Sequence, residues 1–136
     1  MIGVGALFHV QDYIVTFFDS IVRQELPISA FYIVIAALTS FSTELFSNTV
    51  VQIAMFSVIK PLFDPSSIIT IQAFLIITLS CTSAFMTPIA TGVNGLAFGE
   101  MKGISFAKML TTGLIINLIG VLIIAFGVPY LFGWLL

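Results

Sequence analysis

The sequence predicts an all-α integral membrane protein with a re-entrant helical hairpin, a discontinuous transmembrane helix and a terminal transmembrane helix. Composition carries the membrane part of this prediction, because 60% of the 136 residues are hydrophobic, only 7% are charged and the mean hydropathy is +1.22. The hairpin and the discontinuous helix are predicted from interruptions of the apolar runs. Polar, proline and glycine residues interrupt long apolar segments at 43–49 and at 87–95, which indicates two broken helices.

Several classes of function find no support in the composition. A net charge of −2 offers no basic patch, so nucleic-acid binding is not expected. Cys81 is the single cysteine and His9 the single histidine, so neither an intrachain disulfide nor a zinc site is expected. No nucleophile has a visible base beside it, which argues against an enzyme. At roughly 20 residues per span the chain supplies about four membrane segments, which indicates a fragment or a subunit.

Residues 1–25 are predicted to form the end of one helix and then an amphipathic interfacial helix. Apolar residues recur at helical spacing after Val10, while Asp12 and Arg23 occupy other faces, as in helices that lie on a membrane surface. The alternative is the water-exposed end of a transmembrane helix. The first eight residues, Met1–Phe8, are too short and lack the basic leading region of a signal peptide.

The polar segment 43–49 organises the chain, because it interrupts the otherwise apolar stretch 27–62. The arm that follows it, 50–62, is only about 20 Å long at ~1.5 Å per residue, against a hydrocarbon core of about 30 Å. We therefore expect a re-entrant hairpin with both ends on one membrane face and Ser47, Asn48 and Thr49 at its tip. Protein or a water-filled cavity must then cover the broken backbone. The alternative is one long helix over 27–59.

Glu44 is the one charged residue stranded far from the others. A carboxylate at membrane depth is costly unless it is paired, so it indicates a functional site. Glu44 precedes Ser47 by three residues and is expected on the same helical face. We expect it to orient the tip through hydrogen bonds.

Residues 67–101 are predicted to form the broken transmembrane helix. Ser66 or Ser67 can cap its start, and Pro88, Gly92 and Gly95 are expected to break it, because proline removes a backbone donor and glycine loosens the backbone. Hydroxyl residues before the break favour close helix packing.

Residues 104–136 are predicted to form the last transmembrane helix. Its apolar run, Met109–Phe126, carries Asn117, for which we expect a bond to another helix, with the broken backbone as the alternative partner. Tyr130 and Trp134 are expected to anchor its end at the membrane interface.

Asparagine and threonine occur at both breaks, a pattern typical of binding sites in secondary transporters with discontinuous helices. Free N–H groups at a half-helix start attract an anion, while carbonyl, hydroxyl and amide oxygens suit a hard cation such as sodium. No Lys or Arg lies near either break, so an anion would be held by amides, hydroxyls and dipoles, with bound cations offsetting its charge. The alternative is a pair of ordinary proline and glycine kinks.

Three stretches of the chain resemble the C-terminal part of the divalent anion/sodium symporters. They are Thr-Glu-Leu-Phe-Ser-Asn-Thr at 43–49, the segment 80–91 together with Asn94, and the segment 113–120. The resemblance implies the second of two inverted repeats, each with a hairpin tipped by Ser-Asn-Thr and an unwound helix bearing a Thr-Pro-Pro type motif. This chain has Thr91-Gly92-Val93 where that motif is expected.

The resemblance also implies ligands and their residues. A dicarboxylate or sulfate would contact Ser47, Asn48, Thr49, Thr91 and Asn94. A sodium ion, the coupling ion, would be bound by Thr43, Phe46, Asn48, Ala90 and Gly92.

The remaining implications concern the complete protein. They are a first repeat outside this chain, a homodimer, and a multi-pass location in the cell (inner) membrane. The alternatives are a non-transporting membrane subunit or truncated product, and a carrier of a related ion-transporter family.

Overall fold

The computed structural model describes residues 27–100, 103 and 105–135, with isolated positions at 13, 16, 19 and 20. These residues form helices and no strand, which confirms the all-helical prediction for the described part of the chain. The prediction for residues 1–25 lies outside the described residues except at those isolated positions. The main helices are α2 (Ile28–Ser42), α3 (Asn48–Ile59), α4 (Ile68–Cys81), α5 (Gly92–Glu100) and α6 (Phe106–Leu135).

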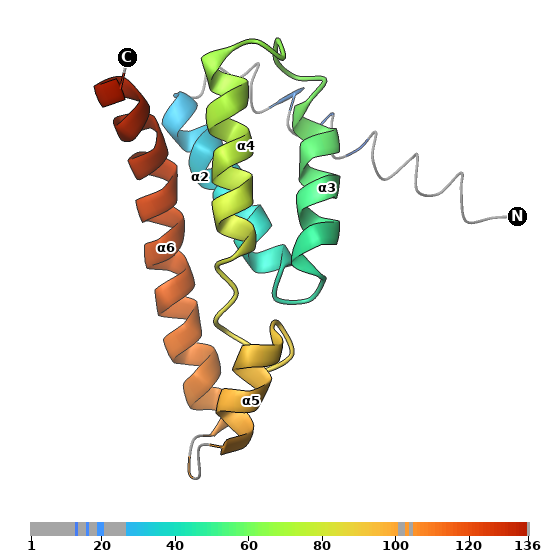
Figure 1. The fold of residues 1–136 in the computed structure, drawn as a ribbon, viewed down its shortest axis with the longest axis vertical. Coiled ribbons are helices and arrows are strands. Elements are labelled where there is room, and N and C mark those ends of the chain that lie inside the picture. The colour runs from blue at the N-terminus through green and yellow to red at the C-terminus, as the bar shows by residue number, and fades with distance from the viewer. Residues whose placement is uncertain are drawn as a thin grey trace, which may run out of the picture.

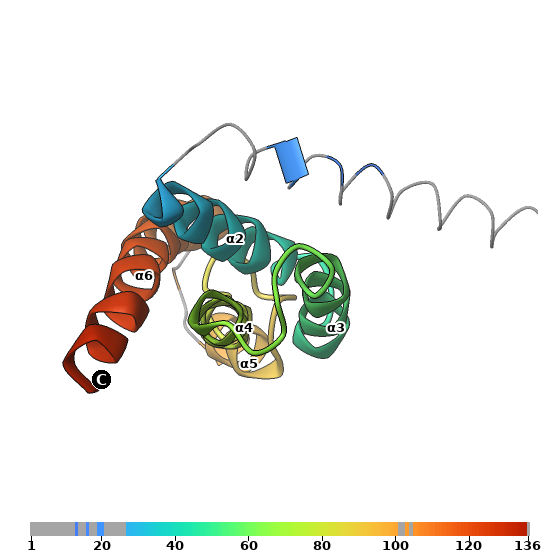
Figure 2. The same cartoon turned by 90° about the horizontal axis from the view of Figure 1, so that it is seen from above.

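Helices α2 and α3 form a hairpin, α4 packs against both of its arms, and α6 lies along α2 and α4 (Figures 1 and 2). Helices α2 and α4 run in the same direction, so both end at the lower end of the bundle in Figure 1. The connection between α2 and α3 lies at this end too, and α5 lies beyond it, beside the start of α6. The fold therefore brings the two helix breaks to one end of the bundle.

An apolar core holds the bundle together. Ile35 of α2, Ile59 of α3 and Ile76 of α4 are each fully buried, and Val121 of α6 is nearly so. Burial of each such side chain contributes about 1.5–3 kcal/mol. All four long helices thus share one core, which fixes the ends that carry the breaks.

Among the described helices, α6 alone is long and apolar enough to cross a membrane, judged by length and composition. Helices α2, α3 and α4 are apolar but shorter. Much of α6 leaves its apolar side chains exposed, including Ile115, Ile123 and Trp134. Such a continuous apolar surface is typical of contact with lipid or with further protein.

The hairpin turn lies slightly earlier than predicted. Helix α2 ends at Ser42 and α3 begins at Asn48, so the predicted alternative of one long helix is wrong. Asn48 and Thr49 were expected in the turn, but they form the first turn of α3. Ser47 holds the non-helical N-cap position, with φ −57° and ψ 135°. The Ser47 carbonyl accepts the first intrahelical hydrogen bond of α3, from the N–H of Val51 at 3.0 Å, and serine is among the residues preferred at an N-cap.

The second break also lies earlier than predicted. Helix α4 ends at Cys81 and α5 begins at Gly92, so the unwound segment is 82–91. The expected break, 87–95, is wrong at its end, because Gly92 and Gly95 lie within α5. Thr91 explains this start, since its hydroxyl accepts the backbone N–H of Asn94 at 3.1 Å and so caps α5.

The turn between α3 and α4 confirms the expected cap. The Ser67 hydroxyl accepts the N–H of Thr70 at 3.2 Å, as at other serine N-caps. Asp64 closes the turn by accepting from the Ser66 hydroxyl and backbone N–H at 2.6 and 2.9 Å. Both hydrogen bonds lower the pKa of Asp64, and the one from the Ser66 hydroxyl has the larger effect.

Helix α6, Phe106–Leu135, covers almost all of the segment 104–136 that was predicted to be the last transmembrane helix. It continues past the apolar run Met109–Phe126 and through Pro129. Proline removes one intrahelical hydrogen bond, yet the flanking residues stay helical.

Candidate functional site

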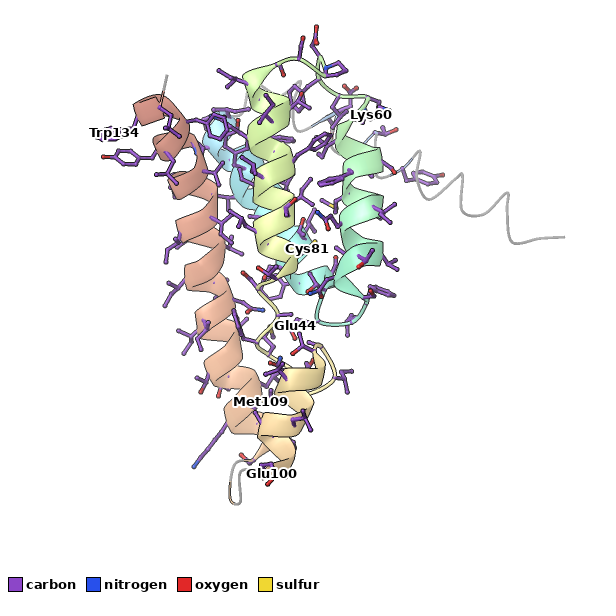
Figure 3. The ribbon with its side chains drawn as sticks, viewed as in Figure 1. Glu44, Lys60, Cys81, Glu100, Met109 and Trp134 are labelled. Carbon is purple, nitrogen blue, oxygen red and sulfur yellow. The ribbon has the colours of Figure 1, made fainter. Side chains whose placement is uncertain are left out.

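Glu44 lies in the hairpin turn, its carboxylate contacts the unwound segment (Figure 3), and it is only 4% exposed. Its Oε1 accepts from the backbone N–H of Met86 and from Asn117 Nδ2, both at 2.8 Å. Its Oε2 accepts from the N–H of Thr87 at 3.0 Å and from the Thr87 hydroxyl at 3.2 Å. Hydrogen-bond donors therefore stabilise this buried carboxylate. None of its partners among the described residues is a cationic side chain.

Side chains from three other elements satisfy the backbone of the unwound segment. The N–H of Phe85 donates to Asn117 Oδ1 at 3.3 Å, and the next two N–H groups donate to Glu44. The carbonyls of Ala84 and Thr87 accept from Asn94 Nδ2 at 2.7 and 3.1 Å. An unwound segment without such partners would leave polar backbone groups unpaired. The break is therefore a defined conformation that distant residues hold.

Two hydroxyl groups, one on α2 and one on its C-cap residue, fix the point at which α4 ends. The Ser40 hydroxyl donates to the Ser83 carbonyl at 2.8 Å, and the Thr43 hydroxyl donates to the Cys81 carbonyl at 3.2 Å. Both hydroxyl residues are fully buried. They satisfy carbonyls that have no intrahelical partner at a helix C-terminus, and so join the first arm of the hairpin to the start of the unwound segment.

Gly113 lets α6 approach the unwound segment closely. A Cβ added at this position would collide with the carbonyl oxygen of Phe85 and would lie 2.5 Å from the Cα of Met86. No such conflict arises at Gly127 on the same helix, where nothing lies within 4 Å. Glycine at 113 is therefore required by the contact between α6 and the break.

The predicted substrate residues fall into two groups. Ser47, Asn48 and Thr49 open α3, where Ser47 and Thr49 are exposed and Asn48 is half-buried. Their side chains make no hydrogen bond within the described residues, which leaves them free for a ligand. Thr91 and Asn94 lie at the other break and hydrogen bond to each other. Asn94 also uses its amide N–H groups on backbone carbonyls, so its predicted contact with substrate stays a prediction.

The predicted sodium residues occupy the same two segments. Thr43 is buried and Phe46 is exposed in the hairpin turn, while Ala90 and Gly92 lie where the unwound segment meets α5. Together with the Asn48 amide they offer hydroxyl, amide and carbonyl oxygens, the donor types that suit a hard cation. The Glu44–Thr87 hydrogen bonds bring these two segments together. In the described part of the chain, no cluster of three or more His, Cys, Asp or Glu residues could hold a metal.

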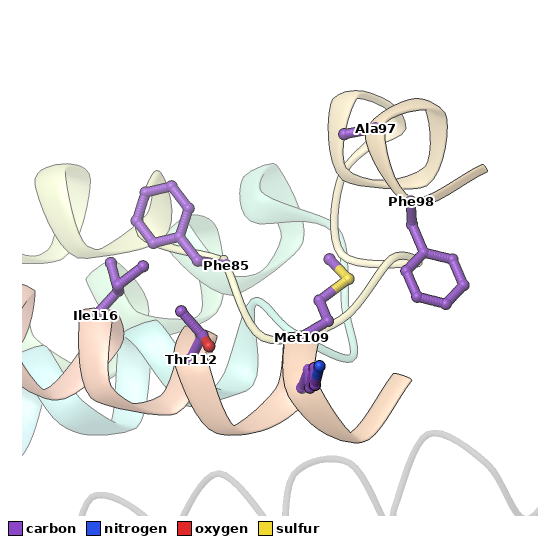
Figure 4. Close-up of a pocket in the computed structure, with 8 residues that line it drawn as sticks. Phe85, Ala97, Phe98, Met109, Thr112 and Ile116 are labelled. Atoms are coloured by element: carbon purple, nitrogen blue, oxygen red, sulfur yellow. The ribbon is translucent and has the colours of Figure 1, made fainter. Parts of the chain in front are cut away.

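A pocket of about 340 Å³ lies beside the unwound segment, between α5 and the start of α6 (Figure 4). Its lining is mainly apolar and contains none of the predicted ligand residues. The lining residues are Phe85, Ala97, Phe98, Lys108, Met109, Thr112, Gly113 and Ile116.

Sequence comparison identifies the family. Solute carrier family 13 member 2 from Homo sapiens is 30% identical over 107 residues, which cover 77% of this chain and 18% of that protein. Na(+)/dicarboxylate cotransporter 3 from Rattus norvegicus is 32% identical over 93 residues, which cover 68% of this chain and 15% of that protein. The chain belongs to the divalent anion/sodium symporter family, which includes solute carrier family 13.

A third member of this symporter family, solute carrier family 13 member 1 from Mus musculus, is 28% identical over 112 residues, or 81% of this chain. The chain spans only 15–18% of the length of these three relatives. No family profile matches the chain. The resemblance inferred from the two breaks is thus confirmed at the level of the family.

Two residues of this site were not among the predicted ligands. Asn117 was expected to contact another helix or the broken backbone, and it bonds both the backbone of Phe85 and the side chain of Glu44. Gly113 allows α6 to approach the backbone of the unwound segment closely. A signal for both exists in the sequence, because a glycine and an asparagine four residues apart share one face of an otherwise apolar helix.

Proposed function

We propose that the chain forms part of a secondary active transporter for divalent anions, dicarboxylate or sulfate, that is coupled to sodium. One observation carries this proposal: the Glu44 carboxylate joins the hairpin turn to the unwound segment, so the ligand residues of both breaks lie at one end of the bundle. The family supports the same function, since one relative is named a Na(+)/dicarboxylate cotransporter.

Helix starts at both breaks suit an anion. Helix α3 begins just after Ser47, and α5 begins just after Thr91. The N–H groups of a first helical turn lack intrahelical partners and carry a partial positive charge, which favours a carboxylate or sulfate. The exposed hydroxyl groups of Ser47 and Thr49 add donors that no residue of the described part uses.

The charge of Glu44 gives a physical reason for coupling to a cation. A dianion bound at these breaks would lie near a buried carboxylate, and like charges repel more strongly in a partly buried site than in water. A sodium ion held by Thr43, Asn48 and the carbonyls of Phe46, Ala90 and Gly92 would offset that repulsion. Sodium binding would then raise the affinity for the anion, as symport requires.

Helix length supports the proposed placement in the membrane. Helix α6 has 30 residues, enough to cross the bilayer, whereas α3 has 12, or about 18 Å, and is too short to cross it. We therefore propose that the hairpin is re-entrant within a multi-pass protein of the cell (inner) membrane. A first repeat supplies the other half of the pocket, and the complete protein is a homodimer. The relatives are much longer than this chain, which covers 18% of human solute carrier family 13 member 2. Their length supports such a larger protein.

Uptake into liposomes tests this function. The complete transporter that carries this chain should take up succinate or sulfate with an inward sodium gradient, and should not do so when choline replaces sodium. Ser47→Ala should raise the KM for the anion about tenfold, because a donor at the start of α3 is lost. Ser57→Ala is the control, since this exposed hydroxyl of the same helix donates to the Ile53 carbonyl one turn earlier and lies away from the turn.

Uptake of neither anion would contradict the proposal and would favour the non-transporting subunit. Uptake that does not need sodium would contradict the coupling. An unchanged KM in Ser47→Ala would contradict the assignment of Ser47.

A further inference from the structure

We propose that Asn117 is a positioning residue that aligns the two helix breaks and thereby sets the affinity of the site for its anion and its cation. This inference rests on the proposed function, although Asn117 itself contacts neither ligand. It comes from α6, outside both breaks, and its side chain is fully buried.

One side chain touches both breaks. Asn117 Nδ2 donates to Glu44 Oε1 at 2.8 Å, and Asn117 Oδ1 accepts from the N–H of Phe85 at 3.3 Å. These partners are 73 and 32 residues away in the sequence. Asn117 and Glu44 together take up the consecutive N–H groups of Phe85, Met86 and Thr87. A change at Asn117 therefore reaches the hairpin turn and the unwound segment at once.

The neighbours require an amide at this position. A carboxylate oxygen of Glu44 can only accept, and the backbone N–H of Phe85 can only donate. Asparagine offers one donor group and one acceptor, and its orientation is fixed because a flipped amide would face Glu44 with its oxygen. An apolar side chain of similar size would form neither hydrogen bond, and a side chain that only accepts would lose the bond to Glu44.

Helix α6 is suited to act as the frame for this alignment. Gly113, one turn before Asn117, allows the helix to contact the backbone at Phe85 and Met86. Farther along, Val121 and Ala125 are buried in the core shared with α2 and α4. Asn117 is therefore held at a fixed distance from both breaks by packing on either side of it.

Asn117→Asp separates positioning from a contribution to stability alone. The new side chain has two acceptor oxygens and no donor, so it would face Glu44 Oε1 as acceptor to acceptor across a hydrogen-bond distance and push the two groups apart. It could still accept from the N–H of Phe85. The variant should therefore show at least a tenfold higher KM for the anion and a higher half-saturating sodium concentration.

The double variant Glu44→Gln with Asn117→Asp reverses the polarity of the pair. The glutamine amide can donate to the aspartate, whose second oxygen can still accept from Phe85. We expect it to recover part of the affinity that Asn117→Asp alone loses. Recovery of this kind requires direct contact between the two side chains.

The experiment is uptake by the complete transporter, with KM, kcat and sodium half-saturation compared with the wild type. Asn117→Ala should also raise KM and sodium half-saturation, and it tests the proposal if Asn117→Asp does not fold. Unchanged affinities in the folded fraction of either variant would overturn the proposal, because a role in stability alone lowers only the number of active molecules.

A measurement that needs no transport keeps the two proposals apart. Ile89 lies in the unwound segment and is 80% exposed, whereas the native Cys81 is 2% exposed. With Ile89→Cys as the reporter, Asn117→Asp should change the rate of maleimide labelling several-fold, and the double variant should restore it. If the wild type takes up no anion, the proposed function fails while this labelling still tests the alignment. An unchanged rate would overturn the alignment.

Discussion

At the scale of single residues, Glu44 carries most of the connection between the two breaks. Each of its carboxylate oxygens accepts two donors. Its importance could be predicted, because a lone carboxylate in an apolar stretch demands partners. The identity of those partners could not, because Met86, Thr87 and Asn117 are far away in the chain and no local pattern links them to Glu44.

Glutamine at position 44 should be tolerated better than leucine, though not fully. Glu44→Gln keeps one acceptor oxygen but turns an amide group toward two donors, whereas Glu44→Leu leaves every donor unpaired. Each buried donor without a partner costs about 1–3 kcal/mol, so unfolding in detergent should occur at a lower temperature in Glu44→Gln and at a still lower one in Glu44→Leu. Glu100→Gln, at the exposed end of α5, is the control. Equal losses in both Glu44 variants would mean that its charge matters more than its hydrogen bonds.

At the scale of helices, residue type predicted that breaks exist but not where they begin. Pro88 and the glycines pointed to a break at 87–95, yet the chain leaves α4 after Cys81. The hydroxyl groups of Ser40 on α2 and of Thr43, the C-cap of α2, stabilise this early end by donating to the carbonyls of Ser83 and Cys81. Such tertiary partners override local preference, and a single sequence does not reveal them.

Gly113→Ala tests the contact between α6 and the unwound segment. The added methyl group would collide with the backbone at Phe85, so we expect a loss of about 1–3 kcal/mol of stability from overpacking. Gly127→Ala, on the same helix with open space around it, should be neutral or slightly stabilising, since alanine favours helix by up to ~1 kcal/mol. Thermal unfolding of the complete protein in detergent measures both. Equal stability of the two variants would contradict the close approach at Gly113.

At the scale of the whole molecule, composition predicted a helical membrane protein, and the described residues are helical with one candidate membrane span. Three stretches together, 43–49, 80–91 with Asn94 and 113–120, predicted the family. Composition could not predict that the two breaks lie at one end of the bundle, because this arrangement depends on α2 and α4 running in the same direction. The same arrangement leaves Asn94 tied to backbone carbonyls, a role that its motif did not indicate.

Asn48 offers the most direct test of the central claim, that the breaks bind an anion and a cation side by side. Its amide can give an oxygen to sodium and N–H groups to the anion, so Asn48→Ala should weaken the binding of both. Asn48→Asp keeps an oxygen for the cation but adds a negative charge near the dianion. At ~4 Å that charge costs about 1 kcal/mol in water and about 4 kcal/mol at an effective dielectric of 20.

Isothermal titration of the complete transporter with sodium and with the anion measures this difference. We predict that Asn48→Ala lowers both affinities, and that Asn48→Asp lowers the affinity for the anion roughly 5-fold to 1,000-fold while it affects sodium binding much less. Anion affinity that stays at the wild-type value in both variants would contradict the account and would leave the hairpin turn with a role in packing alone.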